Sequence, residues 1–231
     1  MLGKGGTLKV RKLYHNVLSP VCRKIRIAMA EKGLAFDLIP EDFSSKRPEF
    51  LEMNPAGDIP VLLEEDGIVV PDHSVICEYL EEKYPEPTLL GLNTAERIEV
   101  RRLTRWFDEK FSREVTSPLL IEKVIKSLKC GGAPNSVVIR LAKAKLRKHL
   151  EYIEWLVVRR NWLAGDIFSY ADIAAAAQLS IIDYLGDVTW DKFPDARDWY
   201  ARIKSRPCFR SILHDKILGI SPPLYYSDLD F

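Results

Sequence analysis

Apolar residues follow two different patterns along the chain. In about the first 85 residues, short apolar runs typical of β-strands alternate with stretches that have the spacing of amphipathic helices. The runs lie at 8–14, 36–39, 60–63 and 68–70, and the helical stretches at 20–32, 48–53 and 74–84. The last two runs flank Glu65-Asp66-Gly67, which predicts a hairpin. The predicted order of elements is therefore β-α-β-α-β-β-α.

After Pro85-Glu86-Pro87 the pattern predicts helices only, at 95–129, 138–158, 171–185, 196–204 and 209–213. Pro118 should kink or divide the first of them. The stretch 171–185 is apolar nearly all round, which predicts a buried central helix. We therefore expect an α/β domain at 1–86, followed by an all-helical domain at 93–231 with an extended tail from about 217.

The composition is that of an ordinary globular protein. The chain has 231 residues, 47% of them hydrophobic, and 34 Lys plus Arg against 33 Asp plus Glu. This balance gives no overall attraction to nucleic acid, and no apolar run reaches the roughly 20 residues that span a bilayer. The four cysteines are far apart and the N-terminus lacks the apolar stretch of a signal peptide, so we expect a cytoplasmic protein without a metal site.

Four short motifs occur in order along the chain: SPVCRKIRIA at 19–28, NPAGDIPVL at 54–62, HSVICEYL at 73–80 and SYAD at 169–172. Together with the order of elements, they resemble the glutathione transferase superfamily over most of the chain. The resemblance implies a thioredoxin-like domain followed by a helical domain. Ser169 and Asp172 have the spacing of a helix-capping box, so their role should be structural.

Ser19 is the candidate catalytic residue. It precedes a helix, whose free N–H groups favour an anion such as a thiolate. The resemblance implies that its hydroxyl binds the thiolate of glutathione. The alternative is that Ser19 is only an N-cap, because capping by itself accounts for a serine there.

The resemblance also implies a ligand site formed by Ile59, Pro60, His73 and Ser74. It implies a cis Ile59-Pro60 bond with an unpaired backbone edge; the alternative is a trans proline that opens a strand. Two positions depart from the family pattern. His73 stands where an acidic residue commonly holds the ligand's ammonium group, and Asp58 stands where a basic or amide residue faces its carboxylate. We therefore expect no required cofactor and, for glutathione, millimolar affinity or worse.

The C-terminal sequence PPLYYSDLDF, residues 222–231, is rich in aromatic and acidic residues. Aromatic side chains are preferred anchors in protein interfaces. The candidate partner-binding residues are Leu224, Tyr225, Tyr226, Asp228, Leu229, Asp230 and Phe231. Because Pro222-Pro223 stiffens the exit, this segment should leave the helical domain extended. The alternatives are a tail folded back on its own domain or a disordered end.

This ending resembles that of transferase-like cell-division proteins of α-proteobacteria. That resemblance implies a non-catalytic, homodimeric adaptor that binds filaments of FtsZ, the tubulin-like division GTPase, and other septal division proteins at the division site. The alternative is an active glutathione S-transferase that uses Ser19; a weaker one is a module for another small ligand. Two basic runs, at 97–105 and 140–148, could add to an interface or be solvated helix faces.

Overall fold

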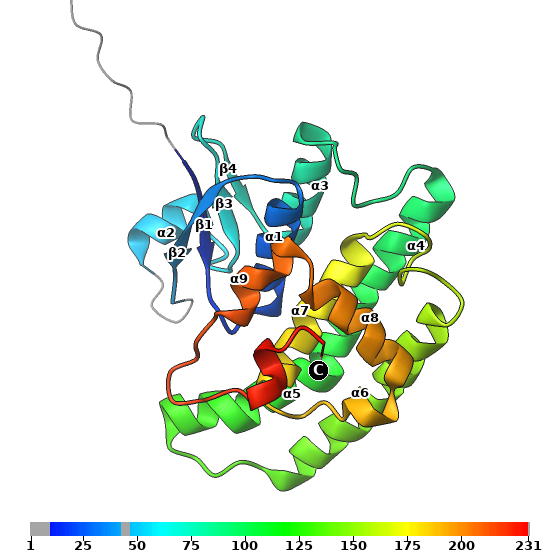
Figure 1. Ribbon diagram of the computed structural model, residues 1–231. Coiled ribbons are helices and arrows are strands. Elements are labelled where there is room, and N and C mark those ends of the chain that lie inside the picture. The colour runs from blue at the N-terminus through cyan, green and yellow to red at the C-terminus, as the bar shows by residue number, and fades with distance from the viewer. Residues whose placement is uncertain (1–9, 43–46, 231) are drawn as a thin grey trace, which may run out of the picture.

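The computed structural model describes residues 10–42 and 47–230. Its N-terminal part is a four-stranded mixed sheet with the strand order β2-β1-β3-β4. The elements are β1 (Arg11–His15), α1 (Pro20–Glu31), β2 (Phe36–Pro40), α2 (Pro48–Met53), β3 (Val61–Leu63), β4 (Val69–Pro71) and α3 (His73–Lys83). β1 pairs with β2 in parallel and with β3 antiparallel. In Figure 1, α2 lies on one side of the sheet and α1 and α3 on the other. The predicted order of elements is confirmed, although residues 8 and 9 of the first predicted run lie outside the described residues.

The rest of the described chain is helical. Its elements are α4 (Thr94–Arg105), η1 (Trp106–Thr116), α5 (Ser117–Leu120), η2 (Ile121–Cys130), α6 (Ser136–Val157), α7 (Tyr170–Tyr184), η3 (Trp190–Lys192), α8 (Pro194–Lys204), η4 (Pro207–Phe209), α9 (Arg210–Leu213) and η5 (Leu224–Ser227). Every residue of α7 is buried, as its apolar composition predicts. Ser169 and Asp172 form the predicted capping box at its start. Within the described residues, no helix is both long enough and apolar enough to cross a bilayer.

Pro118 does not divide its helix, although division is one of the two predicted outcomes. The other predicted outcome, a kink, stays a prediction. The backbone stays right-handed helical at Thr116, Ser117 and Ile121, and α4, η1, α5 and η2 follow one another without a gap. The hydrogen bonding takes the wider π pattern in η1 and η2, on either side of Pro118. In this run, the first turn of the short segment α5 contains the proline, a position where a missing N–H is tolerated.

α1 lies between the sheet and α7 (Figure 1). Its polar face is therefore buried as well as its apolar face. Besides Ile25, Ala28 and Met29, the charged side chains of Arg23, Lys24 and Arg26 are buried. Burying a charge without a partner is costly, so each of these cations requires a nearby acceptor. Their partners connect the N-terminal part of the chain to the helical part.

Candidate functional site

Ser19 caps the N-terminus of α1. Its backbone is extended, and its Oγ accepts a hydrogen bond from the backbone N–H of Cys22 at 3.3 Å. The Cys22 thiol is fully buried, and burial raises its pKa to about 11. Cys22 therefore remains a neutral thiol, and the polar group that this turn offers to a ligand is the Ser19 hydroxyl. Catalysis by Ser19 remains a prediction.

The Ile59-Pro60 bond is cis, as the resemblance implies. Pro60 is buried directly before β3, and Ile59 is partly buried. The Asn54 side-chain amide donates a hydrogen bond to the backbone carbonyl of Asp58 at 2.8 Å, which fixes this turn. The Asp58 side chain is left exposed, so its charge faces the solvent beside the turn.

His73 belongs to a buried polar network that the sequence did not predict. Lys24 Nζ donates a hydrogen bond to His73 Nδ1 at 2.9 Å and forms an ion pair with Asp108 Oδ2 at 2.5 Å. The three residues come from α3, α1 and η1, and the side chains of Lys24 and Asp108 are 1% and 7% exposed. Since Nδ1 accepts from an ammonium group, the ring proton of a neutral His73 is on Nε2.

The charges in this network fix the protonation of both cationic groups. Burial alone would lower the pKa of Lys24, but the neighbouring groups Cys77, Asp108 and Asp72 together outweigh it, and the pKa is raised. Burial, together with the positive charge of Lys24, lowers the pKa of His73. Lys24 is therefore charged and His73 neutral at pH 7.

A cavity of about 480 Å³ lies beside this network. His73, Ser74, Lys24 and Asp108 line it, together with residues of α3 and α4 that include Glu78, Arg101 and Arg105. His73 and Ser74 are the predicted ligand residues that line this cavity, whereas Ser19, Ile59 and Pro60 are not among its lining residues. The ligand site formed by these residues together stays a prediction. The predicted set also lacked Lys24 and Asp108. One feature could have pointed to them: Lys24 lies in a helix that packs between the sheet and α7, where a buried charge needs a partner of opposite charge.

The C-terminal tail folds back on the helical part, which corrects the prediction of an extended exit. Tyr226 is 1% exposed, and its ring packs edge-on against Tyr184 at 5.1 Å between centroids. Arg23 Nη1 donates to the Tyr226 hydroxyl at 3.4 Å and to Ser180 Oγ at 2.8 Å. The partly buried Tyr225 also packs against the core. The physical reason is that the aromatic groups cover apolar core surface and give buried Arg23 a polar partner.

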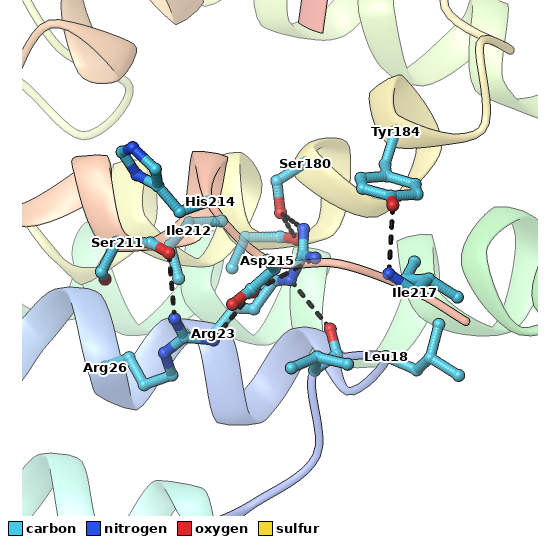
Figure 2. A network of polar contacts seen from close by, with 12 residues as sticks. Leu18, Arg23, Arg26, Ser180, Tyr184, Ser211, Ile212, His214, Asp215 and Ile217 are labelled. Atoms are coloured by element: carbon cyan, nitrogen blue, oxygen red, sulfur yellow. Dashed lines mark hydrogen bonds and ion pairs between the residues drawn. The ribbon is translucent and has the colours of Figure 1, made fainter. Parts of the chain in front are cut away.

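The segment before η5 is fixed by the same network (Figure 2). Arg26 Nη1 forms an ion pair with Asp215 Oδ2 at 2.8 Å, and Arg23 Nη2 lies 3.4 Å from the same oxygen. Tyr184 accepts a hydrogen bond from the backbone N–H of Ile217 at 3.1 Å and donates to the carbonyl of Ile220 at 2.9 Å. Two arginines of α1 and one tyrosine of α7 therefore hold the chain that leads into the tail.

Four of the predicted partner-binding residues remain on the surface. Leu224 is 96% exposed and Leu229 is 37% exposed, and Asp228 and Asp230 are also exposed. Phe231 lies outside the described residues. The tail thus presents apolar and acidic side chains on a segment that is anchored through Tyr226.

Comparison with known proteins gives matches along nearly the whole chain. Residues 13–88 match the glutathione S-transferase N-terminal domain, and residues 135–207 match the C-terminal domain. FtsZ-localized protein A of Caulobacter vibrioides is 47% identical over 224 residues, which cover 96% of this chain and 98% of that protein.

Two solved structures are also close. A glutathione S-transferase from Rhodospirillum rubrum has a TM-score of 0.94 and 55% identity, and FzlA from C. crescentus has a TM-score of 0.93 and 47% identity. Each match covers 96% of this chain and 100% of the other. The resemblance predicted from the four motifs is confirmed, and the chain belongs to the glutathione S-transferase superfamily.

Proposed function

We propose that this chain is a non-catalytic, transferase-like adaptor that binds FtsZ filaments and supports cell division. The observation that carries the proposal is the 47% identity to FtsZ-localized protein A over 96% of the chain. Similarity over 96% of the chain spans both parts of the fold. The anchored tail, with exposed Leu224, Asp228, Leu229 and Asp230, is the surface we assign to FtsZ.

The contacts of His73 support a non-catalytic role. In the family pattern, an acidic residue at this position holds the ammonium group of glutathione. Here the position is a neutral imidazole whose Nδ1 already accepts from the Lys24 ammonium. A second ammonium group would meet the positive charge of Lys24, and Asp108 is already paired with that charge. Glutathione should therefore bind weakly, and the adaptor needs no cofactor.

Active glutathione conjugation is the second candidate function. It is supported by Ser19 at the start of α1 and by the 55% identical structure described as a glutathione S-transferase. The Lys24–His73 contact argues against it, because the pocket of an active enzyme has to accept the ligand's cation.

The adaptor should work as a homodimer in the cytoplasm, be recruited to the division site and contact other septal division proteins there, as the resemblance implies. A symmetric dimer presents two tails and can connect two filaments. The direct test is pelleting of the purified chain with FtsZ polymerised by GTP. We expect the chain to pellet with the filaments and to stay in the supernatant with unpolymerised FtsZ. Recovery in the supernatant in both cases would contradict the proposal.

A further inference from the structure

A second surface, distant in the sequence from the exposed tail residues, combines positive charge with an apolar floor. It is a cavity of about 480 Å³ between α6 and the turn that leads from α7 to η3. We call it the α6 groove and define it by six lining residues: Ile139, Arg140, Lys143, Leu146, Arg147 and Lys192. Leu146 is buried and Ile139 is partly buried, so the floor is apolar.

The basic residues of α6 reach this groove because of their spacing. Arg140, Lys143 and Arg147 are three and four residues apart, so they lie on one face of α6. Lys192 reaches the groove from η3. Lys145, on the same helix, does not line the groove. The basic run at 140–148 therefore has members that line the groove, such as Arg140, and members that face the solvent outside it, such as Lys145.

The positive charge of the α6 groove is largely uncompensated. The lining includes a single acidic residue, Asp187, whose side chain is 2% exposed. Its two carboxylate oxygens are each held by a lysine at 2.7 Å, one by Lys123 and the other by Lys143. Arg140, Arg147 and Lys192 are exposed, and their side chains form no hydrogen bond or ion pair with any other residue in the described ranges 10–42 and 47–230.

We propose that the α6 groove binds an acidic peptide segment of a partner protein, with an apolar side chain of that peptide on Ile139 and Leu146. Three unpaired cations around an apolar floor complement a chain that alternates acidic and apolar residues. Nucleic acid fits less well, because a polyphosphate has no apolar side chain for the floor and the whole chain carries a net charge of only +1.

The α6 groove borders the base of the tail. Gly186, another lining residue, packs against Pro223, so closely that a side-chain carbon added at Gly186 would lie 3.2 Å from Pro223 Cγ. A partner bound in the groove can therefore also contact the exposed tail, because the groove and the base of the tail are adjacent on the helical part. The proposal does not depend on FtsZ, since the groove is defined by its own charge and shape.

The test uses the full chain and a short fluorescein-labelled peptide in which Leu and Phe alternate with Asp and Glu, followed by fluorescence anisotropy. Arg140→Glu/Arg147→Glu should bind the peptide at least about tenfold more weakly than the wild type. Lys145→Glu/Lys148→Glu makes the same change in net charge on the same helix outside the groove, and it should stay within about twofold. Melting temperatures of both variants are compared first, so that loss of fold is recognised.

Two further probes test the chemistry of the occupant. A peptide with the same acidic residues, but Ser in place of Leu and Phe, should bind more weakly because it leaves the floor uncovered. Equal binding of the two peptides, or equal losses in the two double variants, would overturn the proposal in favour of a general charge effect. Tighter binding of a single-stranded oligonucleotide than of the acidic peptide would also overturn it.

Discussion

Lys24 Nζ lies 2.5 Å from Asp108 Oδ2, and this buried ion pair joins α1 of the N-terminal part to η1 of the helical part. Removing one partner leaves the other charge buried and unpaired. Asp108→Asn should therefore lower the free energy of unfolding by about 3–5 kcal/mol, measured by urea denaturation at pH 7. The double variant Lys24→Met/Asp108→Leu should recover most of that loss, because an apolar pair of similar volume needs no counter-charge. A loss below about 0.5 kcal/mol in Asp108→Asn would contradict a tightly buried pair.

The ligand pocket gives a second prediction. Glutathione should bind the wild type with a dissociation constant in the millimolar range or weaker, because Lys24 already occupies His73 Nδ1. Ser19→Ala should remove the N-cap of α1 and lower stability by about 0.5–2 kcal/mol. Titration calorimetry and a thiol-conjugation assay provide the measurements. Micromolar binding with turnover that is lost in Ser19→Ala would instead establish the enzyme.

The tail gives a third prediction, which separates its anchor from its exposed residues. Tyr226→Ala should lower the free energy of unfolding by about 3–5 kcal/mol, since a buried aromatic side chain leaves a cavity against Tyr184. Leu224→Ala is the matched control, because Leu224 is 96% exposed, and it should change stability by less than about 0.5 kcal/mol. Equal effects of the two substitutions on urea denaturation would contradict the docked tail. Deleting residues 224–231 would remove the buried Tyr226 together with the exposed residues. A loss of binding after this deletion could therefore come from loss of stability.

His15 gives a prediction about pH. It is 4% exposed at the end of β1, and burial together with the charge of Arg26 lowers its pKa from 6.5 to about 4. The unfolded chain takes up this proton near pH 6.5, whereas the folded protein takes it up near pH 4. The contribution of neutral His15 to the free energy of unfolding is therefore complete above pH 6.5. As the pH falls from 6.5 to about 4, the protein loses about 3 kcal/mol of this free energy. The difference in unfolding free energy between wild type and His15→Gln should shrink by this amount from pH 7 to pH 4. Parallel pH profiles of the two proteins would contradict it.

Local patterns were enough to predict most of the fold. The β-α-β-α-β-β-α order follows from apolar spacing and turn residues, and the burial of α7 follows from a composition that is apolar all round. Pro118 shows where such reasoning fails. The free-energy cost of a proline within a helix depends on whether the helix can change its hydrogen-bond pattern around the proline. The sequence does not show that η1 and η2 adopt the π pattern on either side of Pro118.

The candidate site could be predicted only in part. Ser19, Pro60 and His73 occupy short motifs, so the sequence locates them. The partners of His73 do not share a motif: Lys24 and Asp108 are 84 positions apart and meet only when α1 packs against the helical part. The docked tail depends in the same way on Arg23, which lies 203 positions before Tyr226. Contacts of this range arise from the packing of whole elements, and local patterns do not contain them.

We propose above all that exposed residues of the anchored tail bind FtsZ. The most direct measurement is co-sedimentation of Asp228→Lys with FtsZ filaments, with Glu52→Lys as the control. Both residues are exposed and the charge change is the same, but Glu52 lies in α2, in the N-terminal part of the chain. If Asp228 pairs with a cationic group of FtsZ, its reversal should cost about 2–5 kcal/mol, or at least about thirtyfold in affinity. We predict this loss in Asp228→Lys, wild-type binding in Glu52→Lys, and melting temperatures that match the wild type. Unchanged co-sedimentation of Asp228→Lys, or an equal loss in both variants, would contradict the account.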